Sequence, residues 1–214
     1  MSENPQVANS PEAIDVEQVL KRNYIIFTKL LGVRVAVIAA LVATPMGLHK
    51  LGVPDSFFLA LPFVAAMGVF ILTVYRVRCG VRLVQCARVL RHYPLEFRTR
   101  VDKKSESWTE YGNVFTIRVS TRGQHGAPLM WAINAAGRRR WPEGTENGAW
   151  VAGDLPFGGV MVVPGSNAML FMNPADWAKL APKREQADAE RIAMARQARL
   201  AERNWKKPMM WRGG

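Results

Sequence analysis

The sequence predicts an α+β membrane protein: a transmembrane α-helical hairpin, then a small antiparallel β-rich domain of roll or barrel type, closed by a C-terminal helix. Two long apolar segments, residues 30–48 and 57–77, predict the hairpin. Short runs of alternating apolar and polar residues between residues 94 and 174 predict the β-rich domain. Residues 175–214 are rich in charged residues and end in a basic and aromatic tail, which predicts a charged helix.

Both apolar segments have the length of a membrane-spanning helix. A helix needs about 20 residues to cross about 30 Å of hydrocarbon. Because lipid offers no hydrogen-bond partners to the backbone, two such segments joined by the turn at residues 49–56 predict a transmembrane hairpin. Residues 1–29 predict an acidic tail and an amphipathic helix. They lack the pattern of a cleavable signal peptide, so we expect the first apolar helix to direct insertion.

Basic residues around the hairpin predict its orientation. Lys21, Arg22 and Lys29 precede the first segment, whereas the turn contributes only Lys50. Five arginines lie at the end of the second segment and beyond it: Arg76, Arg78, Arg82, Arg88 and Arg91. Since short cytoplasmic segments are enriched in Lys and Arg, the protein is predicted to be multi-pass with both termini in the cytoplasm.

The same arginines, with three further residues, are expected at the membrane interface. Tyr24 and Tyr75 lie where interfacial aromatic side chains gather. Arg34 lies about one turn inside the first segment, where its guanidinium either reaches back to the headgroups or acts as an intramembrane charge. The second alternative would need a carboxylate in the second helix, and residues 57–77 contain none.

Residues 78–93 predict a basic juxtamembrane helix that continues out of the membrane and lies against anionic lipid. The helix should stop at Tyr93, because the residue before Pro94 is disfavoured in helical conformation. Cys79 and Cys86 in this helix are interpreted as small buried thiols that remain reduced, with acylation as the alternative.

The β-rich domain is expected over residues 94–174. Six short strands are predicted, at residues 95–101, 114–120, 129–133, 148–152, 159–163 and 168–172. Gly, Pro and Asn separate them, which is typical of turns. A helix is expected to begin at residues 173–176, to break at Pro182 and to include a basic segment at residues 191–207.

Charge and composition point to an anionic partner rather than to catalysis. The formal net charge of +12 favours anionic lipid headgroups, nucleic acid or acidic proteins. His49, His92 and His125 lie in different predicted elements and have no metal-like spacing. No phosphate-binding glycine loop or nucleophile motif is present in the sequence. We therefore expect no catalytic residues, no metal and no cofactor.

The strongest candidate for an anionic-partner site is the run Arg138, Arg139, Arg140 and Trp141 on a predicted hairpin tip. It joins three phosphate-contacting groups to a ring on which a base could stack. Arg118 and Arg122 would extend the basic surface along a neighbouring strand. A solvated or lipid-facing loop, a protein partner and nucleic acid all remain compatible with this pattern.

Residues 153–165, which read GDLPFGGVMVVPG, carry one family resemblance. This strand pair, punctuated by glycine and proline, is similar to one in integral membrane proteins of actinobacteria that carry no assigned function. The resemblance covers residues 30–176 and implies a bacterial inner-membrane location, but no activity. A strand-rich domain closed by a helix also resembles the outline of bacterial pleckstrin-homology-like domains, an analogy of architecture alone.

These observations predict a non-enzymatic protein of the bacterial cytoplasmic membrane that presents a basic β-rich interaction module at the cytoplasmic face. Its expected partners are a bilayer with anionic headgroups and a protein partner or a second copy of the chain. One alternative is a membrane-tethered nucleic-acid-binding protein that acts in DNA transfer or segregation. A second alternative is a membrane-bound enzyme.

Overall fold

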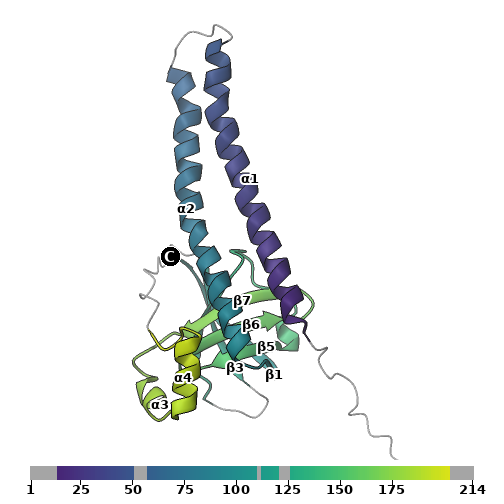
Figure 1. The fold of residues 1–214 in the computed structure, drawn as a ribbon, viewed down its shortest axis with the longest axis vertical. Helices are drawn as coiled ribbons and strands as arrows, with labels where there is room; N and C mark the ends of the chain where they lie inside the picture. Colours follow the sequence, from purple (N-terminus) through teal and green to yellow (C-terminus); the bar gives the residue numbers. More distant parts are fainter. Residues whose placement is uncertain (1–13, 51–56, 110–111, 121–125, 203–214) are drawn as a thin grey trace, which may run out of the picture.

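The computed structural model describes residues 14–50, 57–109, 112–120 and 126–202. Two long helices, α1 (Val16–Lys50) and α2 (Phe57–His92), pack side by side and rise together from a β domain (Figure 1). The β domain contains seven strands, the 3-10 turn η1 (Thr145–Asn147) and two short C-terminal helices.

The ends of the two long helices follow from local chemistry. The carboxylate of Asp15 accepts hydrogen bonds from the backbone N–H groups of Glu17 (2.9 Å) and Gln18 (3.2 Å), which caps the start of α1. α1 has 35 residues, so it is about 50 Å long. α2 ends at His92, immediately before Tyr93 and Pro94, which confirms the predicted stop.

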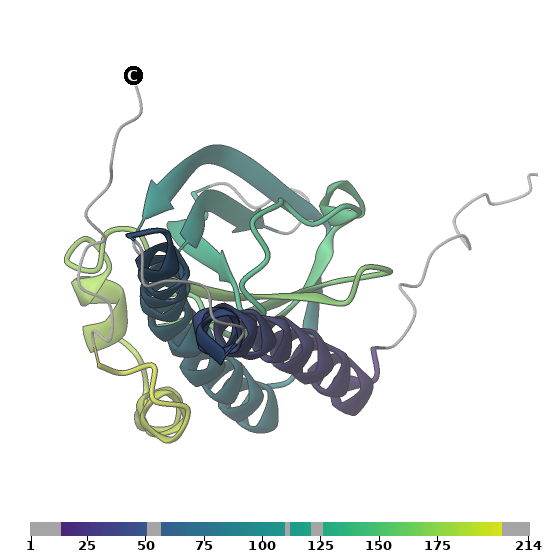
Figure 2. The same cartoon turned by 90° about the horizontal axis from the view of Figure 1, so that it is seen from above.

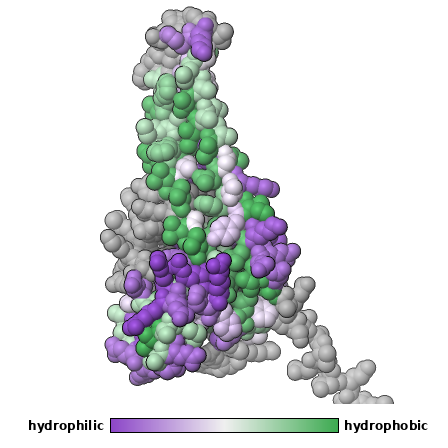
Figure 3. All heavy atoms as spheres, viewed as in Figure 1, coloured by the Kyte–Doolittle hydropathy of each residue, from purple (hydrophilic) through white to green (hydrophobic). Residues whose placement is uncertain are grey.

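Apolar side chains surround the distal half of both helices, the half remote from the β domain (Figure 3). Among the described residues, α1 is the one helix long and apolar enough to cross a membrane. The apolar stretch described in α2, Ala60–Val74, is shorter than that criterion requires.

The strands form one antiparallel sheet that curls into a half-barrel (Figure 2). In chain order they are β1 (Glu96–Arg98), β2 (Arg100–Thr109), β3 (Gly112–Ser120), β4 (Leu129–Asn134), β5 (Ala149–Asp154), β6 (Gly158–Val163) and β7 (Ala168–Pro174). Their order in the sheet is β1-β5-β6-β7-β4-β3-β2.

The single strand predicted at residues 95–101 is in fact two. A bend at Thr99 separates β1, which pairs with β5, from β2, which pairs with β3. β1 and β2 are the two edge strands of the sheet. Because one residue joins them, the curled sheet brings its own edges together at Thr99. The other five predicted strands are confirmed, with small shifts at their ends.

Alternating residues divide the sheet into two packed faces, as the pleat of a strand requires. In β6, Val160 and Val162 face the helices, whereas Met161 and Val163 face the interior of the curl. The helix-side core also contains Val19 of α1 and Leu83 of α2. The interior core is filled by fully buried side chains of the central strands: Phe115, Ile117, Met130, Leu170 and Met172.

The segment at residues 78–93 packs on the β domain through its apolar stripe, so contact with lipid stays a prediction for its exposed side alone. Leu83, Cys86 and Val89 are fully buried against the sheet, and Arg82 is only 5% exposed. Burial raises the pKa of the Cys86 thiol well above its usual range, so the thiol is unreactive. The apolar stripe of this basic helix therefore covers one face of the β domain.

The C-terminal prediction also needs correction. β7 continues to Pro174, and two short helices follow, α3 (Ala181–Glu185) and α4 (Ala189–Gln197), in place of one long helix. Pro182 lies in the first turn of α3, where its missing N–H costs no hydrogen bond. The predicted basic helix at residues 191–207 ends at Gln197, and residues 203–207 lie outside the described part of the chain.

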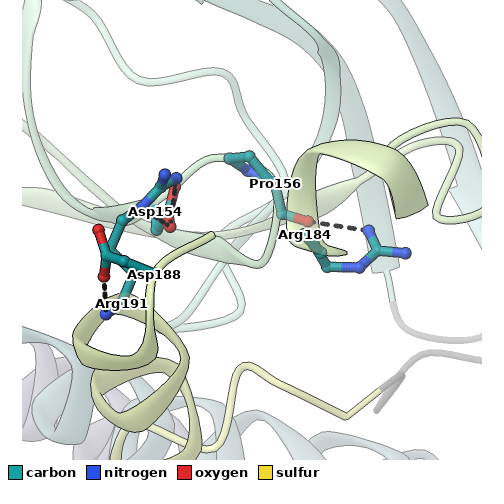
Figure 4. A network of polar contacts seen from close by, with 5 residues as sticks. All are labelled: Asp154, Pro156, Arg184, Asp188 and Arg191. Atoms are coloured by element: carbon teal, nitrogen blue, oxygen red, sulfur yellow. Dashed lines mark hydrogen bonds and ion pairs between the residues drawn. The ribbon is translucent and has the colours of Figure 1, made fainter. Parts of the chain in front are cut away.

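Polar contacts hold the C-terminal helices to the β5–β6 turn (Figure 4). Arg191 forms a bidentate ion pair with Asp154, with N···O distances of 2.8 to 3.0 Å. The carboxylate of Asp188 accepts the Arg191 backbone N–H at 2.8 Å, which caps α4. Arg184 donates to the carbonyl oxygen of Pro156 at 3.0 Å. The GDLPFGGV part of residues 153–165 is therefore the turn on which α3 and α4 dock.

Candidate anionic-ligand site at the base of α1

The three predicted arginines lie on the arginine loop, which we define as residues 135–144 between β4 and η1. Asn134, at the end of β4, is 2% exposed. Its side-chain oxygen accepts the backbone N–H of Ala136 at 3.0 Å and of Arg138 at 3.4 Å. Gly137 adopts a φ of 74°, which favours glycine. This turn directs the chain away from the sheet just before the arginines.

Further contacts fix the rest of the loop. Asn113 of β3 donates to the carbonyl oxygen of Arg139 at 2.7 Å, and the buried hydroxyl of Thr145 donates to that of Pro142 at 3.1 Å. The backbone is thus held at several points, while the side chains of Arg138, Arg139 and Arg140 are all exposed.

Trp141 anchors the loop rather than offering a free stacking surface. Its ring packs edge-to-face against Phe115, with centroids 4.9 Å apart. The ammonium nitrogen of Lys103 lies 5.7 Å from the centroid of the same ring. Trp141 is half-buried over the interior core of the curled sheet.

A pocket of about 530 Å³ opens between the arginine loop and α1, and we call it the arginine pocket. The loop from Gly137 to Glu143 forms one wall, and Ser166 of the β6–β7 connection and Ala168 at the start of β7 form another. Leu30 of α1 completes the lining. Its volume lies within the range of about 300–1,000 Å³ that is usual for ligand sites.

Three basic residues line the pocket. Within the described part of the chain, no acidic side chain forms an ion pair with Arg138, Arg139 or Arg140. Glu143 is the single carboxylate in the lining. Three guanidinium groups against one carboxylate give the pocket a net positive charge and planar donors suited to phosphate or carboxylate oxygens.

The position of the pocket depends on how α1 docks on the sheet. Asn23 is 2% exposed, and its amide nitrogen donates to the carbonyl oxygens of Val19 and Asn167, each at 2.8 Å. Asn167 has a φ of 50° in the β6–β7 connection. This contact holds the connection against α1, and Leu30 follows about two turns further along the helix.

Arg118, another of the predicted anionic-partner residues, does not line this pocket. Arg118 is exposed on β3, five positions beyond Asn113, which corresponds to about 17 Å along the strand. Arg122 lies outside the described residues. Of the predicted residues that the structure describes, the three loop arginines and Trp141 line the pocket.

The predicted interface residues separate into several environments. Arg34 is half-buried and donates to the carbonyl oxygen of Leu72 in α2 at 3.1 Å, so it links the two helices. Tyr24 and Arg91 are exposed, and Arg88 is half-buried. The side chains of Tyr75, Arg76 and Arg78 lie outside the described residues.

A second pocket, of about 840 Å³, lies beside α3 and α4 and is less suited to an anion. Its lining includes Arg184, Arg196 and Arg199 but also two carboxylates, Glu185 and Glu202. The guanidinium of Arg184 already donates to two backbone carbonyls and stacks on Trp177, 3.9 Å from the ring centroid. Burial lowers the pKa of Arg184 from its ordinary value. The contacts of Arg184 therefore stabilise the fold.

No protein-family model, curated protein or solved structure matches the chain. A function for this protein is therefore inferred from the geometry of the site.

A metal ion is held by a cluster of His, Cys, Asp or Glu side chains. Among the described residues, no group of three or more His, Cys, Asp or Glu side chains lies close enough to hold a metal ion. His49 lies at the end of α1 and His92 at the end of α2, while His125 is outside the described residues.

Sequence reasoning found the arginines but missed Leu30, Asn134 and Ser166, which build the rest of the pocket. One usable signal was Asn23, an amide on the apolar stripe of residues 13–28. A polar side chain at such a position usually makes a specific buried hydrogen bond. Nothing in the sequence indicated which carbonyl would be its partner.

Proposed function

We propose that the protein is a non-enzymatic, two-span protein of the bacterial cytoplasmic membrane, with both termini in the cytoplasm. Its curled β domain lies against the inner leaflet, where the arginine loop contacts anionic headgroups. The domain then serves as an interaction module held at the membrane face.

The observation that carries the proposal is the shared lining of the arginine pocket. Leu30 is the first residue of the apolar segment of α1, and it lines the same pocket as Arg138, Arg139 and Arg140. A helix that enters the bilayer at Leu30 places the arginine loop at headgroup depth. Each basic residue near an anionic leaflet contributes about 1 kcal/mol of attraction.

The apolar surface supports the two-span arrangement. Val33 and Val64 are 64% and 69% exposed, although they lie on different helices. Contiguous exposed apolar surface of this kind marks contact with a membrane or a partner. Because α1 and α2 pack side by side, and Arg34 of α1 donates to the Leu72 carbonyl of α2, an anchor formed by α1 would place the apolar part of α2 in the same bilayer.

Topology is tested with fluorescent and phosphatase reporters fused to the full chain, either in the turn between α1 and α2 or after Gly214. We expect phosphatase activity from the turn and fluorescence from the C-terminus. The reverse pattern, or fluorescence from both positions, would overturn the two-span orientation.

Headgroup contact is tested by amide hydrogen exchange of the full-length protein in lipid nanodiscs. We expect the peptide that covers residues 135–144 to exchange more slowly in nanodiscs with anionic lipid than in zwitterionic nanodiscs. Added salt should reverse the effect, because it screens exposed charges. Equal exchange in both lipids would contradict the proposal.

Nucleic-acid binding is the alternative that the exposed arginines also favour. It predicts protection of residues 135–144 by a DNA oligonucleotide, with an affinity that falls steeply as salt rises. Trp141 weakens this alternative, because the ring already packs on Phe115. Protection by DNA in zwitterionic nanodiscs would make it the better explanation.

A further inference from the structure

We infer that the arginine pocket binds a single anionic phospholipid, with its phosphate on the loop arginines and an acyl chain along α1. The inference rests on the proposed membrane location and goes beyond it. A general attraction between a basic surface and a leaflet requires no pocket, whereas this site would select one lipid molecule of defined chemistry.

The two sides of the pocket match the two parts of a phospholipid. The arginine loop contributes Arg138, Arg139 and Arg140 to the lining, and the β6–β7 connection contributes Ser166. Leu30 and the ring of Trp141 supply apolar surface to the same cavity. A soluble phosphate would use only the first side, whereas an amphiphile uses both.

The charge of the pocket calls for an anion. The three guanidinium groups have no acidic partner within the described part of the chain, and Glu143 is the single carboxylate in the lining. A guanidinium forms two parallel hydrogen bonds to phosphate oxygens, which a lysine ammonium does not.

The loop is organised before any ligand arrives. Asn134, Asn113 and Thr145 hold its backbone by hydrogen bonds of 2.7 to 3.4 Å. Binding would therefore order only the arginine side chains, and a preorganised site loses less free energy to ordering.

α1 offers a path for the acyl chain. Leu30, Val33 and Val37 follow the three- and four-residue spacing that places side chains on one face of a helix. They are 38%, 64% and 42% exposed, so this face is open from the pocket toward the distal half of α1.

The test measures lipid binding to the full-length protein in neutral detergent, by native mass spectrometry and by thermal shift. The probes are phosphatidylglycerol, phosphatidylcholine and glycerol phosphate. The pocket variant is R138Q/R139Q/R140Q. The control variant, R100Q/R118Q/R196Q, removes the same charge from exposed arginines elsewhere in the domain. Both lower the formal net charge from +12 to +9 (12 − 3 = 9).

We expect the native protein to retain one phosphatidylglycerol that saturates, and to prefer it to phosphatidylcholine at least about tenfold, which corresponds to about 1.4 kcal/mol. The pocket variant should lose this preference, and the control variant should keep it. R138K/R139K/R140K, which keeps the charge, should lose most of the preference because lysine lacks the bidentate geometry.

Three results would overturn the inference. Equal losses in the pocket and control variants would show that net charge alone attracts the lipid. Equal binding of glycerol phosphate and phosphatidylglycerol would assign the pocket to a soluble phosphate compound. Several lipids bound without saturation would show a surface effect. The reporter fusions test the membrane orientation separately, so the two failures are distinguishable.

Discussion

The distal and proximal halves of α2 are both rich in apolar residues, yet they meet different surroundings. In the distal half, Leu61, Val64 and Leu72 are 48%, 69% and 60% exposed. In the proximal half, Leu83, Cys86 and Val89 are fully buried against the curled sheet. One continuous helix of 36 residues is therefore exposed along its distal half and buried against its own β domain along its proximal half.

The junction between the halves lies where α1 and α2 cross closely. A Cβ at Gly80 of α2 would lie 3.0 Å from the ring of Phe27 in α1, so glycine allows the contact. At Gly68, in the distal half, a Cβ would meet nothing within 4 Å. Apolar content alone therefore does not predict contact with a membrane, because the apolar side chains of the proximal half pack on the sheet.

Truncation of a leucine in each half should give the largest contrast. Leu83→Ala removes a fully buried side chain and should lower the free energy of unfolding by about 2–5 kcal/mol. Leu72→Ala, the same change at an exposed position, should cost less than about 0.5 kcal/mol. Denaturant unfolding followed by tryptophan fluorescence measures both, since all 7 Trp residues follow residue 107. Similar losses of unfolding free energy in the two variants would contradict the difference in packing between the two halves of α2.

An arginine introduced by substitution should be tolerated in the proximal half of α2 and should be costly in the distal half. Val64→Arg puts a guanidinium on the exposed distal surface and should disfavour membrane insertion by about 2.5–3.5 kcal/mol. Val81→Arg, at an exposed position beside the β domain, should insert normally. An insertion assay with a reporter in the turn between α1 and α2 separates the two. Normal insertion of Val64→Arg would show that the distal half does not contact hydrocarbon.

Loss of the Arg191–Asp154 ion pair, which joins α4 to the end of β5, should have a smaller effect on stability. The side chain of Asp154 is 13% exposed, so Arg191→Met leaves a largely buried carboxylate without its bidentate partner. We expect the free energy of unfolding to fall by about 1–3 kcal/mol. Arg196→Met, an exposed position on the same helix, is the control. In the double variant Asp154→Asn/Arg191→Met, the loss of unfolding free energy should differ from the sum of the losses in the two single variants, because the residues are in contact.

Local patterns in the sequence predicted most of the elements. Alternation located five of the strands within a few residues, and Pro94 correctly ended α2. The bend at Thr99 was not predictable, because it depends on the sheet closing until its two edges meet. The long C-terminal helix was predicted from composition, whereas the Asp154–Arg191 pair and the packing of Leu200 favour two short helices on the β5–β6 turn.

The candidate site was predictable in its chemistry but not in its shape. Three consecutive arginines are visible in any reading of the sequence. That Arg118 points elsewhere follows only from the strand pairing. Leu30 and Ser166, which turn a basic loop into a pocket, are distant in sequence and meet it through tertiary packing.

Tyr93 gives the smallest and most specific test, at the end of the proximal half. Burial, followed by the nearby carboxylate of Asp154, raises the pKa of Tyr93 to about 12. An unfolded chain releases this proton at pH of about 10. Since the folded state holds the proton more tightly, the native protein should lose stability as the pH rises from about 10 to 12. Tyr93→Phe should lack this component of the pH dependence.

Below pH 10, Tyr93→Phe should leave the stability unchanged or slightly higher. The hydroxyl has no hydrogen-bond partner within the described part of the chain, so its removal abolishes no bond and relieves an unpaired buried group. Tyr24→Phe, at an exposed position on α1, should keep the native pH profile. Unfolding by denaturant at pH 8 to 12 compares the three proteins. Parallel profiles for wild type and Tyr93→Phe would mean that Tyr93 reaches solvent, and that the sheet covers less of α2 than its buried leucines indicate.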